Sequence, residues 1–146
     1  MHALVVSPFM GEDLQIIKQA EQRWASYADA PELFQGDHLL HTDWSPGNVL
    51  INDTTHLVDW AWPTQGAAWI DPACWVVWLV ASGHRPPAAE DWAAQVPAWR
   101  SAPRDALDSF ARAQAVMWVG IAQDGPDSWT NRIADAARRW AGHGST

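Results

Sequence analysis

The spacing of apolar residues predicts an amphipathic helix near the start of the chain. Over residues 12–30, apolar side chains recur at three- and four-residue steps, so they would share one face of a helix. Pro31 would end this helix, because proline lacks the backbone N–H that a helix interior requires. The stripe consists of Ile17, Ala20, Trp24 and Tyr27.

Three further helices are predicted in the second half of the chain. In the first, Asp71 would be the N-cap with Pro72 at the first helical position, and the apolar run that follows would stop at Gly83. Helices over residues 105–122 and 128–141 carry apolar stripes of helical period. Those stripes consist of Leu107, Phe110, Ala111, Gln114 and Met117, and of Trp129, Ile133, Ala137 and Trp140.

The rest of the pattern predicts one β-hairpin and a connection broken by prolines. Short apolar runs at residues 49–51 and 57–58 flank a turn at 52–55 that is rich in Asn, Asp and Thr. Four prolines interrupt residues 85–105, which predicts a loop with one short helix. The expected fold is therefore α+β and mostly α-helical, with a single small hairpin near the middle.

The composition is that of one globular domain over residues 1–146. Apolar residues make up 48% of the chain and charged residues 18%, and this length is enough to bury one core. The net charge of −8 argues against nucleic acid as a partner, because phosphate binding needs basic patches. No apolar run approaches the roughly 18 residues of a membrane span, so no membrane association is expected.

Cysteine usage and the N-terminal sequence indicate the cytoplasm. Cys74 is the only cysteine and lies inside an apolar run, which excludes a disulfide framework and suits a reducing compartment. The opening "MHALVVSPFMGED" lacks the basic start and the long apolar run of a signal peptide. We therefore expect a cytoplasmic protein, and the sequence does not indicate its oligomeric state.

One loop concentrates the residues with the most informative chemistry. The segment "HTDWSPGN" matches H-x-D-x-x-x-x-N with His41, Asp43 and Asn48, and "LVDW" adds Asp59 beyond the predicted hairpin. A hairpin returns its two ends to the same place, so Asp59 would come back beside Asn48. Their oxygen atoms are ligands that Mg²⁺ accepts, while Asp43 could orient a hydroxyl group.

These motifs resemble the catalytic loop and the metal-binding segment of the kinase-like fold. The spellings "PGN" and "DW", followed by "IDPA" at residues 70–73, are similar to the aminoglycoside phosphotransferase family rather than to protein kinases. The resemblance covers about residues 14–141 and only the C-terminal lobe of the family's two lobes. It implies a kinase-like C-terminal lobe whose hairpin carries the catalytic and metal-binding segments.

The resemblance also implies a reaction and a role for each motif residue. The reaction is the Mg²⁺-dependent transfer of a phosphoryl group from ATP or GTP to a hydroxyl of a small molecule, with an aminoglycoside-like antibiotic as the first expectation. Asp43 would be the catalytic residue, and Asn48 and Asp59 would bind Mg²⁺ and, through it, the nucleotide. His41 would brace the loop, and Asp71 would be structural, first as a helix cap and second as a tether of the loop. Carboxylates near the C-terminal helices would meet a polycationic substrate: Asp108, Asp124 and Asp127.

Two parts of the kinase-like fold have no counterpart in the sequence. There is no G-x-G-x-x-G segment to cover the phosphates. There is also no lysine placed to pair with a glutamate, because the only lysine, Lys18, lies on the predicted amphipathic helix. The N-terminal nucleotide-binding lobe is therefore expected to be absent and the isolated chain to be inactive. The chain would be a fragment of a longer enzyme, completed by that lobe or by a partner chain. The alternative is a catalytically inactive pseudoenzyme or an interaction module.

A metal site of another class is also compatible with part of the motif. His41 and Asp43 could join a distant histidine, His84 or His143, in the facial triad of a non-haem iron oxygenase. That fold requires many alternating strands, whereas this sequence predicts one hairpin among helices. The phosphotransferase interpretation is therefore preferred.

Overall fold

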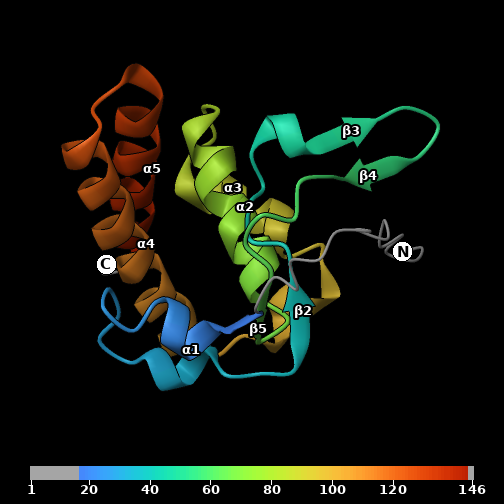
Figure 1. The fold of residues 1–146 in the computed structure, drawn as a ribbon, viewed down its shortest axis with the longest axis horizontal. Helices are drawn as coiled ribbons and strands as arrows, with labels where there is room; N and C mark the ends of the chain where they lie inside the picture. The colour runs from blue at the N-terminus through green and yellow to red at the C-terminus, as the bar shows by residue number, and fades with distance from the viewer. Residues whose placement is uncertain (1–16, 145–146) are drawn as a thin grey trace, which may run out of the picture.

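A computed structural model describes residues 17–144, and in this part of the chain five α-helices accompany two small sheets (Figure 1). The helices are α1 (Ala20–Arg23), α2 (Ile70–Ala81), α3 (Pro86–Ala93), α4 (Arg104–Asp124) and α5 (Ser128–Gly144). Short 3₁₀-helices lie in the connections: η1 (Pro31–Phe34), η2 (Pro46–Asn48) and η3 (Pro97–Ser101). The fold is thus α+β and mostly helical, as the sequence predicts.

The larger sheet has three strands and mixed direction. Strand β5 (Thr64–Gly66) lies in the middle, with β1 (Lys18–Gln19) parallel on one side and β2 (His38–Leu40) antiparallel on the other. The sequence does not predict this sheet, because strands of two or three residues are too short to show a period of two. It matters for the site because β2 leads directly into the loop that contains the motif.

The smaller sheet is the predicted hairpin. Strands β3 (Val49–Ile51) and β4 (Thr55–Leu57) pair antiparallel, with Val49 opposite Leu57. In Figure 1 the hairpin projects away from the helices, and its tip lies far from α4 and α5. The turn is held by Asn52, whose Oδ1 accepts a hydrogen bond from the backbone N–H of Thr54 at 3.1 Å. The hairpin prediction is confirmed.

The long helix predicted over residues 12–30 is wrong for the part that the structure describes. Lys18 and Gln19 are extended and pair with β5, and only Ala20–Arg23 form a helical turn. Residues 12–16 lie outside the described residues. The periodic stripe fails because tertiary contacts override it: Arg23 reaches across to hydrogen-bond Thr64, a residue of β5.

The helices of the second half follow the prediction closely. Helix α2 ends just before Gly83, whose φ of 111° suits glycine at a helix end. Helix α3 and η3 fill the proline-rich connection, and α4 and α5 cover the two predicted C-terminal helices. Helix α5 begins at a true N-cap, because Asp127 Oδ1 accepts hydrogen bonds from the backbone N–H groups of Trp129 at 2.8 Å and Thr130 at 2.7 Å.

The start of α2 requires a correction. Asp71 is not the N-cap of this helix: the helix begins at Ile70, and no side chain caps it. The carboxylate of Asp71 lies within the first turn and is used by the loop described below. The predicted Asp-Pro cap failed because the loop offers this carboxylate better donors than the helix does.

The core is built on α2 and an aromatic cluster. Helix α2 is apolar on nearly all sides and packs against α3, α4 and α5. Next to it, four buried rings make edge contacts with centroid separations from 5.1 to 6.3 Å, a favourable arrangement of aromatic rings. These rings belong to Trp24, Phe34, Trp69 and Phe110. Among residues 17–144, no helix combines the length and the apolar character needed to cross a membrane.

Candidate functional site

The loop between β2 and η2 is tied to the first turn of α2 by Asp71. One carboxylate oxygen of Asp71 accepts the backbone N–H of His41 at 3.0 Å, and the other accepts the N–H of Thr42 at 2.8 Å. The second oxygen also accepts the indole N–H of Trp44 at 3.1 Å. Three donors of one loop therefore converge on a single side chain, which fixes the backbone immediately before Asp43.

Thr42 has a backbone conformation that β-branched residues rarely adopt. Its φ is 69°, in the left-handed region that favours glycine. The N–H of Thr42 is held by Asp71, and its hydroxyl lies within hydrogen-bond distance of Arg23 Nη1 and the carbonyl of Trp62. These contacts offset the strain, and a strained residue held in this way is characteristic of functional sites.

His41 joins the loop to the base of the hairpin. The ring is fully buried, and its Nδ1 accepts the backbone N–H of Asp43 at 3.2 Å. Since Nδ1 is an acceptor, Nε2 carries the proton and donates to the carbonyl of Val58 at 2.9 Å. Trp60 covers the ring, with centroids 4.6 Å apart. His41 is therefore committed to contacts within the protein and does not face a ligand.

Asn48 and the end of the hairpin lie next to each other. The Asn48 side-chain amide donates to the carbonyl of Asp43 at 3.3 Å, and its backbone carbonyl accepts the N–H of Val58 at 2.9 Å. The chain then turns at Asp59, whose φ of 58° is left-handed. The hairpin thus returns the chain to Asn48, as the sequence predicts, and Asp59 follows directly after that contact.

The side chains of Asn48 and Asp59 offer different environments. Asn48 is 9% exposed, and because its amide nitrogen donates to Asp43, its Oδ1 is the atom left to accept a ligand. Asp59 is exposed, and its carboxylate has no hydrogen bond or ion pair with the part of the chain that the structure describes. An amide oxygen and a free carboxylate fit the oxygen ligands that Mg²⁺ prefers.

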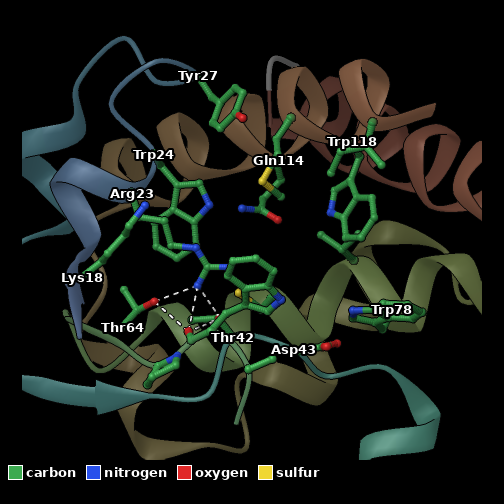
Figure 2. Close-up of a pocket in the computed structure, with 17 residues that line it drawn as sticks. Lys18, Arg23, Trp24, Tyr27, Thr42, Asp43, Thr64, Trp78, Gln114 and Trp118 are labelled. Carbon is green, nitrogen blue, oxygen red and sulfur yellow. Dashed lines mark hydrogen bonds between the residues drawn. The ribbon is translucent and has the colours of Figure 1, made fainter. Parts of the chain in front are cut away.

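Asp43 stands at the edge of a pocket of about 520 Å³. One of its carboxylate oxygens accepts the backbone N–H of Ser45 at 3.3 Å, which leaves the other oxygen available to a ligand. Figure 2 shows Thr42 and Asp43 on one side of the pocket, with Trp24, Gln114 and Trp118 on the other. Of Asp43, Asn48 and Asp59, only Asp43 lines this pocket.

The pocket walls come from α2, α4 and the segments around α1 and β5. Five tryptophan and tyrosine side chains of the described residues line them: Trp24, Tyr27, Trp62, Trp78 and Trp118. Cys74 is also in the wall, and burial raises the pKa of its thiol far above the usual range. Because its thiol stays protonated, Cys74 is not a nucleophile here.

Arg23 closes the side of the pocket nearest the loop. Its Nη1 donates to the hydroxyl of Thr64 at 2.7 Å and to the carbonyl of Trp62 at 3.1 Å. The guanidinium lies 4.8 Å from the ring centroid of Trp24, within the range of a cation–π contact. Burial lowers the pKa of Arg23, while nearby acidic groups that include Asp43 raise it; an arginine remains charged under such shifts.

Two buried donors in the pocket wall have no hydrogen-bond partner among the described residues. The indole Nε1 of Trp24 and the amide Nε2 of Gln114 are inaccessible to solvent and find no hydrogen-bond acceptor within residues 17–144. Both residues line the pocket, and they are 1% and 3% exposed, respectively. A buried donor without an acceptor is costly, so this pair marks a place where a ligand atom would be stabilising.

The acidic residues expected to bind a polycation are elsewhere. Asp108 pairs with Arg104 at 2.9 Å, Asp127 caps α5, and neither of them lines the pocket, nor does Asp124. Across residues 17–144, no three His, Cys, Asp or Glu side chains are grouped so that they could hold a metal ion. The iron triad of His41, Asp43 and a distant histidine is therefore not formed.

Several pocket residues were not identified as site residues from the sequence, although the sequence pattern around one of them indicates a buried polar group. Gln114 is the only amide in the otherwise apolar stripe of α4, and a polar residue on a buried face requires a partner. Arg23 and Trp62 had no such signal, because their roles depend on the docking of α1 against β5. Comparison of the chain with protein-family models, curated proteins and solved structures gave no match.

Proposed function

We propose that this chain is the substrate- and metal-binding part of a phosphotransferase that moves a phosphoryl group from ATP or GTP to a hydroxyl of a small molecule. The observation that most directly supports this proposal is the position of Asp43. Its side chain opens on an aromatic pocket, while its backbone carbonyl is bonded to Asn48 and so to the base of the hairpin that ends at Asp59. The contact between Asp43 and Asn48 thus links the pocket to the segment that would hold the metal.

The role of Asp43 follows from its bonds. Ser45 holds one carboxylate oxygen, and His41 holds the backbone N–H, so the remaining oxygen has a defined direction. That oxygen would accept the hydrogen bond of a substrate hydroxyl and align the hydroxyl oxygen for attack. In phosphoryl transfer, such positioning and the neutralisation of charge account for most of the catalysis.

Asn48 Oδ1 and the carboxylate of Asp59 would hold Mg²⁺. When bound, the ion would neutralise charge on the nucleotide phosphates. The donor chemistry fits, because both ligands are hard oxygens and Mg²⁺ usually takes few protein ligands. The resemblance of "HTDWSPGN" and "LVDW" to the aminoglycoside phosphotransferase family supports the same assignment of roles.

The cover of the nucleotide would come from another lobe or from a partner chain. The sequence has no glycine-rich phosphate loop, and Lys18 is its only lysine. Lys18 is exposed and lines the substrate pocket. Without a preorganised charge on the phosphates, the largest catalytic contribution is missing. We therefore expect the chain alone to bind the metal and not to transfer phosphate at a measurable rate.

Binding of Mn²⁺ tests this proposal directly. Free Mn²⁺ is measured by electron paramagnetic resonance during titration of the wild-type chain, of Asp59→Asn and of Asp53→Asn. Asp53 is an exposed carboxylate in the hairpin turn and serves as the matched control. We expect Asp59→Asn to weaken Mn²⁺ binding about tenfold or more and Asp53→Asn to leave it unchanged. Equal binding by all three proteins would refute the metal site and with it the proposed reaction.

A second candidate function is an interaction module, and the hairpin favours it. Leu50 and Ile51 on β3 are 51% and 77% exposed, and Figure 1 shows that the hairpin projects from the body of the protein. A partner that covers these two side chains would remove their apolar surface from water. Sedimentation velocity of wild type and Ile51→Glu tests the interaction module. The module would be favoured if the wild type self-associates, the variant does not, and Mn²⁺ binding does not depend on Asp59.

A further inference from the structure

The charge of the substrate pocket differs from that of the protein as a whole. The chain carries a net charge of −8, yet among residues 17–144 the charged side chains that line the pocket are two cations, Lys18 and Arg23, and one carboxylate, Asp43. A polycation would be repelled by both cations and would find a single counter-charge. The pocket therefore suits an uncharged ligand better than a polycationic one.

The shape and chemistry of the walls narrow the ligand further. Trp24 and Trp118 lie across the pocket from the loop in Figure 2, and Trp62 and Trp78 add further ring surface. Pockets with aromatic walls and a few polar groups bind ligands largely through apolar contact, and the polar groups set their orientation. A flat apolar ring system would use this surface.

The polar groups that set the orientation are identified by their missing partners. Trp24 Nε1 and Gln114 Nε2 are both donors, so the ligand atom opposite them must be an acceptor. Figure 2 shows the side chains of Trp24 and Gln114 across the pocket from Thr42 and Asp43 of the loop. A ligand with an acceptor at one end and a hydroxyl at the other would bond to Trp24 and Gln114 at one side and to Asp43 at the other.

We propose that the pocket binds a flat, uncharged aromatic hydroxy compound with a carbonyl or ring oxygen, and not a polycation. The oxygen accepts from Trp24 and Gln114, and the hydroxyl lies at Asp43. The role of that hydroxyl as the phosphoryl acceptor rests on the proposed function. The preference for a neutral aromatic ligand with an acceptor does not, because it follows from the pocket alone.

Three probes separate charge from acceptor chemistry. At pH 6.5, isothermal titration calorimetry of the full chain compares 7-hydroxycoumarin, which has a ring carbonyl, with 2-naphthol, which has none, and with the polycation kanamycin. We expect 7-hydroxycoumarin to bind about threefold to tenfold more tightly than 2-naphthol, the value of one net hydrogen bond, and kanamycin to bind most weakly. Tighter binding of kanamycin, or equal binding of the two aromatic probes, would refute the proposal.

A pair of variants assigns the preference to the pocket. Gln114→Met keeps the size of the side chain and removes the donor, and Gln95→Met alters an exposed glutamine outside the pocket. Gln114→Met should remove most of the advantage of 7-hydroxycoumarin and leave 2-naphthol unchanged, whereas Gln95→Met should alter neither. An unchanged advantage in Gln114→Met would show that the donor does not contact the ligand. The wild-type comparison of probes remains decisive if either variant fails to fold.

These titrations contain no nucleotide and no metal, so their outcome does not depend on the proposed reaction. Binding of 7-hydroxycoumarin that depends on Gln114, together with equal Mn²⁺ binding by wild type and Asp59→Asn, would support this inference and refute the phosphotransferase. Preferential binding of kanamycin with Asp59-dependent Mn²⁺ binding would do the reverse.

Discussion

Asp71 shows how one side chain can determine the geometry of a site that is distant in sequence. It lies in the first turn of α2, but its carboxylate accepts two backbone N–H groups and an indole N–H from the loop at residues 41–44. The loop includes Thr42, whose φ of 69° is strained, and the bond from its N–H to Asp71 helps to hold that conformation. Asp71 is thus a positioning residue for Asp43.

Replacement of Asp71 by alanine should destabilise the protein. Loss of bonds to a charged acceptor costs about 1.5–3 kcal/mol, which corresponds to a fall of roughly 2–4 °C per kcal/mol in the melting temperature. Asp91→Ala is the control, since Asp91 is exposed on α3 and has no bond to the described residues. Thermal denaturation of both variants checks the prediction. Equal melting temperatures would mean that water replaces Asp71 at the loop.

At this scale the sequence predicts the loop better than the pocket. The motif spacing places His41, Asp43 and Asn48 in one loop, and the hairpin brings Asp59 back to it, because these relations are local. The helix cap at Asp71 was wrong, since a carboxylate near a helix start can serve any nearby donor. The choice between those donors depends on tertiary contacts that a single sequence does not show.

Among the elements, β5 passes so close to its neighbours that only glycine fits. A Cβ on Gly66 would lie 2.5 Å from the Cβ of Ala20 and 3.0 Å from the carbonyl oxygen of Phe34. These atoms belong to η1 and to α1, the helix that contains Arg23 and has Trp24 at its C-cap. No periodicity in the sequence reveals this close approach.

Two glycine-to-alanine substitutions should therefore have opposite signs. Gly66→Ala should lower the stability by about 1–3 kcal/mol, because the backbone must shift to relieve the clash. Gly120→Ala, on α4, meets no atom within 4 Å and should raise the stability by about 0.5–1 kcal/mol through reduced backbone entropy of the unfolded chain. Urea denaturation of both variants measures the difference. Destabilisation by both would indicate that α4 is constrained in a way the packing does not show.

At the scale of the whole molecule, the pocket is the feature that the sequence predicts least well. Its walls combine Arg23 and Trp24 near the start of the described chain, Thr42 and Asp43 in the loop, and Gln114 on α4. Thr42, Asp43 and Gln114 lie in segments whose type can be inferred from local pattern, whereas the long helix predicted around Trp24 was wrong. Their convergence depends on how α1, β5 and α4 dock, which local patterns do not encode.

The helices are joined far from the pocket by Glu90, which makes the stability depend on pH. Glu90 on α3 accepts the indole N–H of Trp140 on α5 at 2.8 Å and pairs with Arg104 on α4 at 3.1 Å. Burial alone would raise the pKa of Glu90, but the bonds from Arg104 and Trp140 outweigh it, and the pKa lies below its ordinary value of 4.5. The native state therefore binds a proton at Glu90 less readily than the unfolded chain does.

The lowered pKa of Glu90 determines how the stability of the protein changes with pH. Since the pKa is lowered on folding, Glu90 stabilises the native state above pH 4.5, and the contribution is lost as the pH falls through the lower native pKa. Glu90→Gln should cost on the order of 1 kcal/mol at pH 7, and its difference from wild type should shrink below pH 4.5. Urea denaturation from pH 7 to pH 3 measures this, with the exposed Glu32→Gln as control. A difference that stays constant over this range would show that the charge of Glu90 does not join the three helices.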